Sequence, residues 1–207
     1  MFVDRLDAAR RLARALTPYR GTHPLVLAIP RGAVPMAKVI ADELGGEVDV
    51  VLVRKLPAPG NPEFAIGAVD ETGWTYLADH AQRMGVDAHY LEAEKAKQLA
   101  LMRQRRAQYS PVRPPIDPVG RVVIVVDDGL ATGSTMIAAL HAIRARGPDK
   151  LICAVPVAPP ETADRVRTCC DELICLERPY EFYAVGQFYG NFPQVADEEV
   201  IALLADN

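Results

Sequence analysis

The sequence predicts an α/β fold, in which helices flank a doubly wound, mostly parallel sheet. Short apolar segments rich in β-branched residues are typical of strands buried on both faces; they lie at 25–29, 48–53, 122–126, 150–156 and 172–176. Helical segments separate most of these strands, and this alternation favours parallel pairing with right-handed crossovers. A length of 207 residues fits a single domain, 1–207.

The predicted helices follow from apolar residues at helical spacing and, for most of them, from the glycines or prolines that begin or end the pattern. They lie at 2–16, at 36–44, from Gly133 to a stop at Gly147, at 161–170 and at 196–204. The last of them has an acidic first turn, which the helix dipole favours.

Composition narrows the class of protein. The net charge of −4 and the lack of a long Lys/Arg run argue against nucleic acid as a partner. Charges in the N-terminal helix exclude a signal-peptide core, and no segment is apolar for the length of a membrane span. We therefore expect a cytoplasmic protein. None of the four cysteines forms a CxxC pair, so buried free thiols are favoured over a zinc site or a disulfide.

The most informative segment is the turn after strand 122–126, because it lies at the carboxyl end of a central strand and opens a helix. Its glycines and hydroxyls, with the free amides of the first helical turn, suit a phosphate. Its two acids suit vicinal hydroxyls or a divalent metal. The residues concerned are Asp127, Asp128, Gly129, Ala131, Thr132, Gly133, Ser134 and Thr135. Together they predict a sugar phosphate site; the alternative is a simple turn with an N-cap.

Two further groups follow strands at the same edge of the sheet. Arg31 and Gly32 come after the first strand, and Arg54 and Lys55 come after the second. An arginine fork, a lysine and a close-approaching backbone suit a diphosphate. The alternatives are a tight turn at Gly32 and solvated cations in loops.

The segment from Val123 to Thr135 resembles the phosphoribosyl diphosphate (PRPP) motif of type I phosphoribosyltransferases, and the resemblance extends over residues 22–195. It has four hydrophobic residues, two acids, two variable residues and then Ala-Thr-Gly-x-Thr. In that family the loop holds the 5-phosphate and the acids bind the ribose 2- and 3-hydroxyls. The resemblance implies Mg²⁺ as cofactor, which Asp127 and Asp128 would hold indirectly, through water or the ribose hydroxyls. It also implies a homodimer.

Residues 56–75 resemble the flexible lid of adenine-type members. Four residues that interrupt regular structure, Pro57, Pro59, Gly60 and Pro62, predict a loop there, and a loop of this length is usually functional. A hairpin of 64–69 with 74–77 would follow. In the family the peptide bond before the glycine of the diphosphate loop is often cis, so the bond between Arg31 and Gly32 is expected to be cis or strained.

Residues 77–109 are predicted to be a helical insertion, running from 77 to 84 and from 88 to 109, followed by a stiff proline-rich linker at 110–118. Its arginines, Arg103, Arg105 and Arg106, suit a solvated face; the alternatives are a rim of the active site and a dimer surface.

The C-terminal segment, 177–207, is predicted to form a small hood. It resembles the acceptor-binding segment of purine-type members, which places Tyr183 at the stacking position and Val185 at the edge-reading one. A buried aromatic cluster is the alternative. Ala131 and Gly190 stand where hypoxanthine–guanine members carry acids, which argues against those two acceptors.

The predicted function is transfer of a 5-phosphoribosyl group from PRPP to a nitrogenous acceptor in nucleotide metabolism, with release of diphosphate. Arg31 and Lys55 would stabilise the leaving group, and the two acids would face the oxocarbenium-like sugar. The alternative is a non-catalytic regulator that senses PRPP or a nucleotide. Hydrolysis is disfavoured, because the four histidines lie outside the predicted site and are expected to be surface residues; they are His23, His80, His89 and His141.

Overall fold

A computed structural model describes residues 1–78, 81, 83–109 and 115–206. Its main sheet has five strands in the order β2-β1-β6-β7-β8, and every neighbouring pair is parallel. The strands are β1 (Leu25–Ala28), β2 (Glu47–Val50), β6 (Val122–Val126), β7 (Lys150–Val157) and β8 (Glu172–Glu177). The predicted doubly wound parallel sheet is confirmed.

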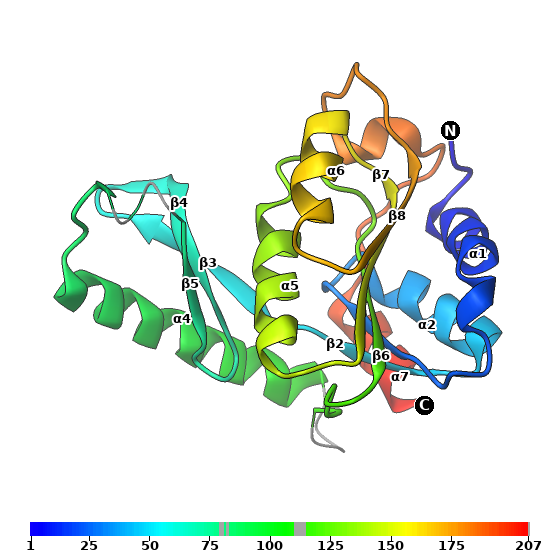
Figure 1. Cartoon of the computed structure of the whole chain (residues 1–207), viewed down its shortest axis with the longest axis horizontal. Helices are drawn as coiled ribbons and strands as arrows, with labels where there is room; N and C mark the ends of the chain where they lie inside the picture. Colours follow the sequence, from blue (N-terminus) through cyan, green and yellow to red (C-terminus); the bar gives the residue numbers. More distant parts are fainter. Residues whose placement is uncertain (79–80, 82, 110–114, 207) are drawn as a thin grey trace.

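Helices cover both faces of this sheet (Figure 1). One face carries α1 (Arg5–Ala15), α2 (Val34–Leu44) and α7 (Asp197–Ala205); the other carries α5 (Ser134–Ala145) and α6 (Pro160–Arg167). Alternate residues of β6 enter different cores, Ile124 and Val126 on the first face, Val123 and Val125 on the second. Burial on both faces explains the continuous apolar pattern of β6.

The order of the strands locates a ligand site. The chain passes from β1 outward to β2 and then returns to place β6 on the other side of β1. In open α/β sheets, ligands bind beyond the carboxyl ends of the strands at such a reversal. The loops after β1 and β6 therefore meet at the favoured position.

Residues 53–77 form a second, antiparallel sheet of three strands, β3 (Val53–Ala58), β4 (Asn61–Asp70) and β5 (Thr75–Leu77). The predicted hairpin is confirmed, but the expectation that the prolines exclude strands is wrong. Pro57 lies in β3, which is an edge strand with register shifts on both sides of that residue. Edge strands and bulges tolerate proline, because a backbone N–H group there needs no partner on a neighbouring strand. The expected second strand is also interrupted, so that Arg54 and Lys55 lie within β3 and not in a loop.

Helix α4 (Ala88–Tyr109) confirms the longer helix of the insertion and extends beside the second sheet (Figure 1). Leu77 belongs to β5 and not to a helix. Residues 79, 80 and 82 of the shorter predicted helix lie outside the described residues, and so do residues 110–114 of the proline-rich linker.

Arg106 anchors α4 to the body of the protein. Its Nη1 lies 2.9 Å from Oδ1 of Asp49, Nε donates to Oε2 of Glu71 at 2.8 Å, and Nη2 donates to the Val50 carbonyl at 3.0 Å. The Arg106 and Asp49 side chains are only 13% and 3% exposed. Arg106 therefore does not belong to a solvated face.

The C-terminal segment returns to the N-terminus. The Phe2 amide donates to the Phe188 carbonyl at 2.8 Å, and the Gly190 amide donates to the Phe2 carbonyl at 2.8 Å. The rings of Phe2 and Tyr189 lie 5.5 Å apart, and those of Tyr189 and Phe192 lie 4.7 Å apart. Phe2 and Tyr189 are buried. Tyr189 and Phe192 of the tail thus belong to a packed aromatic cluster, as the alternative interpretation expects, whereas Tyr183 is exposed and lies outside it.

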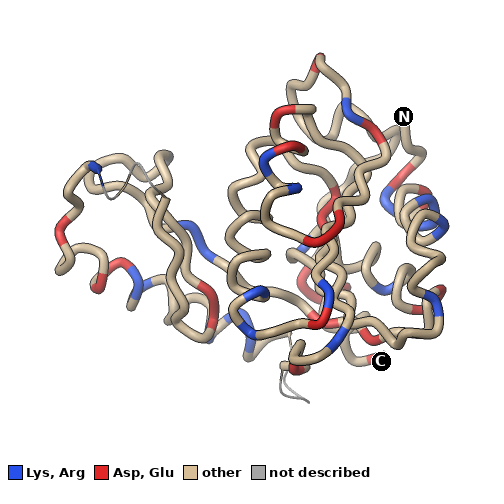
Figure 2. The backbone as a smooth tube through the Cα atoms, in the orientation of Figure 1, with Lys and Arg blue, Asp and Glu red and all other residues tan. Residues whose placement is uncertain are grey.

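Basic and acidic residues are interspersed along the chain (Figure 2). Within the described residues, no helix combines the length and the apolar character needed to cross a membrane.

All four cysteines are free thiols; Cys153 is buried and the other three are partly buried. His141 is not a plain surface residue, because its ring stacks on Tyr76 with centroids 4.4 Å apart.

Candidate active site

The loop after β6 forms a small cradle at the N-terminus of α5. Gly133 precedes the helix with a left-handed φ of 74°, which glycine adopts without strain. The Oγ atoms of Thr132 and Ser134 lie 3.1 Å apart. A hollow of about 200 Å³ opens here, lined by Asp127, residues 129–136 and Val185. Hydroxyls and the amides of a first helical turn around a hollow of this kind suit a phosphate group.

Helix α6 supports the cradle from behind. Thr162 Oγ1 donates to the Ala131 carbonyl at 2.8 Å, and Arg165 Nη2 donates to the Thr132 carbonyl at 2.6 Å. Neither residue could be identified from the sequence, because hydroxyl and guanidinium groups on a helix carry no signal of a partner some thirty positions away.

The two acids have different surroundings. Asp127 lines the small hollow, and its Oδ1 accepts a hydrogen bond from the Asp128 amide at 2.9 Å. Burial, together with the neighbouring charge of Asp128, raises the pKa of the Asp127 carboxyl well above its usual value. Asp128 is paired with Arg5, whose Nε and Nη2 lie 3.0 and 2.9 Å from its Oδ2. Burial raises the pKa of Asp128 as well, while Arg5 acts in the opposite direction.

Arg5 was missed by sequence reasoning and connects three parts of the site. Besides Asp128, it donates from Nη1 to the Pro193 carbonyl at 2.5 Å. Its guanidinium carbon also lies 3.8 Å from the centre of the Phe192 ring. In the sequence Arg5 is one of several charged residues of the N-terminal helix, and nothing local shows that it meets the loop after β6.

The loop after β1 closely approaches the acids. A Cβ atom on Gly32 would collide with the Asp128 carboxylate, so only glycine fits in this arrangement. The expected cis bond between Arg31 and Gly32 is corrected: the cis bond is one position earlier, between Pro30 and Arg31. Both bonds belong to the same short loop, and the residue pattern does not distinguish between them.

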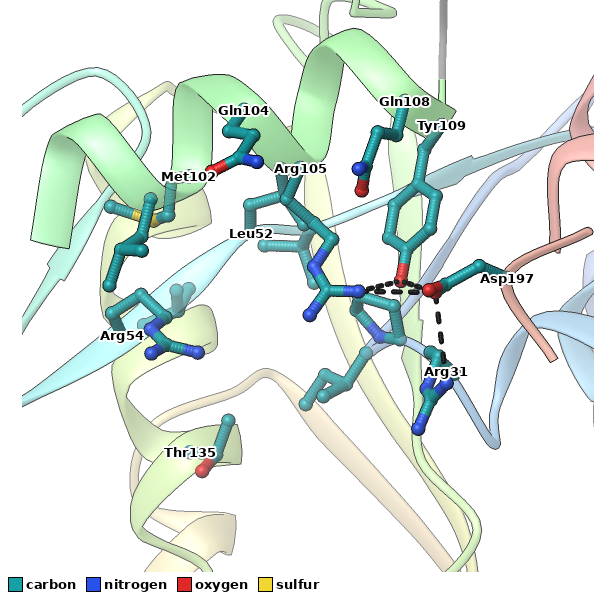
Figure 3. A pocket seen from close by; sticks show the side chains of 15 residues that line it. Arg31, Leu52, Arg54, Met102, Gln104, Arg105, Gln108, Tyr109, Thr135 and Asp197 are labelled. Atoms are coloured by element: carbon teal, nitrogen blue, oxygen red, sulfur yellow. Dashed lines mark hydrogen bonds and ion pairs between the residues drawn. The ribbon is translucent and has the colours of Figure 1, made fainter. Parts of the chain in front are cut away.

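A larger hollow of about 480 Å³, which shares Thr135 with the small one, is lined in part by the loop after β1 (Figure 3). Arg31 and Arg54 line it, together with Thr135 of the cradle and Arg105 of α4. Lys55 is exposed and follows Arg54 in the strand, so its side chain points to the opposite face of β3. The structure thus brings Arg31 and Arg54 together but separates Lys55 from them.

The two residues expected at the acceptor position differ in their contacts. Val185 lines the small hollow and packs so closely on Gly129 that a Cβ there would meet its Cγ1 at 2.6 Å. Tyr183 is 88% exposed. Val185 therefore lies at the site, whereas Tyr183 lies at the surface beside it.

Comparisons with known proteins agree with the family resemblance of the segment from Val123 to Thr135. The family model described as "Phosphoribosyl transferase domain" matches residues 3–190. Two proteins of Mycobacterium tuberculosis named "Putative phosphoribosyl transferase", from strains CDC 1551 / Oshkosh and H37Rv, are each 42% identical over 99% of this chain. The match covers 46% of each relative, so this chain spans about half their length. The crystal structure of TT1426 from Thermus thermophilus is 47% identical with a TM-score of 0.90, covering 99% of this chain and 98% of that one.

Proposed function

The chain belongs to the phosphoribosyl transferase family, and on that premise we propose that it transfers a 5-phosphoribosyl group from PRPP to a nitrogenous acceptor and releases diphosphate. One observation carries this proposal. A cradle suited to a phosphate, a pair of acids and a cationic hollow lie side by side at the reversal of the sheet. PRPP carries a phosphate, two vicinal hydroxyls and a diphosphate in the same sequence.

In this proposal the loop from Ala131 to Thr135 binds the 5-phosphate through its amides and hydroxyls, and the dipole of α5 adds to the attraction. Asp127 and Asp128 accept hydrogen bonds from the ribose hydroxyls. Their negative charge also favours the positive charge that develops on the sugar as the bond to diphosphate breaks. Arg5 fixes the position of Asp128, so the carboxylate needs no rearrangement when the sugar binds.

Arg31 and Arg54 face the departing diphosphate in this proposal and compensate the charge that accumulates on it. Lys55 is expected to contribute to the same task, but it points away from the hollow. Alternation along β3 puts Lys55 opposite Arg54, so a movement of the strand that brought Lys55 to the diphosphate would take Arg54 away from it. Independently of Lys55, we propose that residues 56–75, which directly follow these two cations, act as a lid that closes and excludes water during transfer.

We propose Mg²⁺ as the cofactor. Among the described residues, no cluster of three or more His, Cys, Asp or Glu side chains offers a site made of protein ligands alone. The Asp127 carboxylate at the small hollow supplies oxygen, which Mg²⁺ prefers, and the ion keeps several waters when bound by one or two carboxylates. Asp127 and Asp128 would therefore hold it through water or the ribose hydroxyls. When bound, Mg²⁺ would offset negative charge on the diphosphate.

The acceptor is proposed to be a nucleobase or a related flat ring at the C-terminal hood. Val185 at the edge of the small hollow and the exposed ring of Tyr183 support this position. Ala131 and Gly190 offer no carboxylate to a purine nitrogen, so an acceptor other than hypoxanthine or guanine is expected.

We also propose a homodimer, which light scattering after gel filtration would test.

The proposal is tested by measuring diphosphate release from PRPP and Mg²⁺ with a panel of purines, pyrimidines and small amines. At least one acceptor should support turnover. The double variant Thr132→Ala/Ser134→Ala should weaken PRPP binding about a hundredfold or more, since each of the two lost hydrogen bonds to a charged group is worth about 1.5–3 kcal/mol. The control Thr22→Ala removes an exposed hydroxyl outside the site.

Two results would count against the proposal. If PRPP binds tightly but no acceptor supports turnover, the protein is a sensor and not a transferase. If the cradle variant binds PRPP as well as the Thr22→Ala control does, the assignment of the 5-phosphate position is wrong.

A further inference from the structure

The larger hollow carries a charge opposite to that of the whole chain. Its lining includes three arginines and one aspartate, a net formal charge of +2, whereas the chain as a whole carries −4. The arginines come from three different elements: Arg31 from the loop after β1, Arg54 from β3 and Arg105 from α4. Such a concentration of cations in a concave site attracts anions.

Helix α4 contributes to this hollow in two ways. Arg105 reaches into it directly (Figure 3). In addition, the buried side chain of Gln98 accepts a hydrogen bond from Nε of Arg54 at 3.0 Å and so orients that arginine. The insertion is therefore part of the wall of the site and not only an appended helix.

Among the described residues that line this hollow, Asp197 is the one carboxylate, and three polar groups surround it. Oδ1 of Asp197 lies 3.1 Å from Nη1 of Arg105 and 3.8 Å from Nη1 of Arg31, and it accepts a hydrogen bond from the Tyr109 hydroxyl at 2.9 Å. Figure 3 shows these three groups pointing at the same oxygen. One carboxylate oxygen thus occupies the position in which a phosphate oxygen could meet the same two arginines.

We propose that α4 completes the diphosphate site: Arg105 contacts the leaving diphosphate, and Asp197 is an internal counter-anion that the diphosphate displaces. This inference rests on the proposed function, because it identifies the anion as the diphosphate of PRPP. Asp197 keeps Arg31 and Arg105 from repelling each other while the site is free. The diphosphate then replaces one carboxylate oxygen by several phosphate oxygens, which arginine binds in a bidentate manner.

The first test is the affinity for inorganic diphosphate, measured by calorimetry with and without Mg²⁺. Arg105→Gln should weaken binding about tenfold, the loss expected for one charge-assisted hydrogen bond. The control is Arg103→Gln, which removes the same charge from an exposed position on the same helix and should change the affinity less than twofold. Arg105→Lys should give an intermediate loss, since lysine keeps the charge but not the fork. Equal affinities for the Arg105→Gln and Arg103→Gln variants would overturn the assignment.

The second test predicts an effect of opposite sign. Asp197→Asn keeps the size of the side chain but removes the competing anion, so it should tighten diphosphate binding about threefold or more. Weaker binding by this variant, with or without Mg²⁺, would show that Asp197 is not a displaced counter-anion. Circular dichroism of each variant verifies that α4 and α7 remain folded.

The same variants separate this inference from the proposed function. With the wild-type protein turning over PRPP, an unchanged KM for PRPP in Arg105→Gln sinks the inference alone. If the wild type never binds PRPP, yet its affinity for inorganic diphosphate depends on Arg105, the proposed function fails and the anion site remains.

Discussion

Replacing Arg106 by methionine is expected to lower the stability of the protein substantially. The variant leaves the buried Asp49 carboxylate without its cation, and removal of one partner of a buried ion pair typically costs about 3–5 kcal/mol. Asp49 keeps two backbone donors, the amides of Val50 at 2.7 Å and Ile116 at 2.9 Å, so we expect the lower end, about 3 kcal/mol. For a chain of this size that corresponds to a drop in Tm of about 6–12 °C.

Thermal unfolding followed by circular dichroism measures the drop. Fluorescence of the only tryptophan, Trp74, adds local information, because its ring stacks on His141 of α5 with centroids 6.3 Å apart. Arg103→Met on the same helix is the matched control and should change the Tm by less than about 2 °C.

A second variant distinguishes the buried charge from the loss of packing. Asp49→Asn together with Arg106→Met removes both charges, so it should recover part of the stability lost in the single variant. If Arg106→Met unfolds at the same temperature as the Arg103→Met control, Arg106 does not anchor α4, and the reasoning from the buried ion pair is refuted.

Three further predictions concern the site and its support. Burial raises the pKa of Asp127, so the folded state binds more protons than the unfolded state, and ionisation of this carboxyl costs stability as the pH rises above its usual pKa. The Asp127→Asn variant should therefore have a higher Tm than the wild type at pH 8 and bind PRPP more weakly; a lower Tm would contradict this. Gly133→Ala should cost about 1 kcal/mol or more in urea unfolding and weaken PRPP binding, since φ is 74° and the new Cβ would lie 2.9 Å from Cγ2 of Thr162; Gly147→Ala, with φ of 73° but nothing within 4 Å, isolates the effect of φ. Burial lowers the pKa of His141, so the unfolded state binds more protons and stability falls as the pH drops below about 6.5; His141→Phe should lose less Tm between pH 7 and pH 5, and identical profiles would exclude this contribution.

Local patterns predicted most of the architecture. The run from Val122 to Val126 identified the central strand because a strand buried on both faces needs apolar residues at every position. Helices α2 and α5 followed from their apolar spacing and from the glycines beside them, and α7 followed from its apolar residues and its acidic first turn. Strand β3 was missed, since whether its Pro57 is tolerated depends on the strand having a free edge and a bulge.

The candidate site was predicted in part for the same reason. The cradle from Asp127 to Thr135 is continuous in the chain, so its chemistry can be read from its order. A place for Arg105 at the rim of the active site could be given only as an alternative to a solvated face, because helical spacing does not show which face of α4 meets the hollow. Lys55 was grouped with Arg54 as its neighbour in sequence, although alternation along β3 sends the two side chains to opposite faces.

The amino-acid sequence by itself determined the fold class, the position of the turn after β6 and the kind of ligand that this turn suits, since these depend on residues a few positions apart. Only the tertiary structure decided which distant groups meet: Arg5 with Asp128 across 123 positions, and Arg105 with Asp197 across 92. The physical reason is that such pairs arise from the order of the strands and the packing of helices on them. Neither is encoded in the periodicity of a single segment.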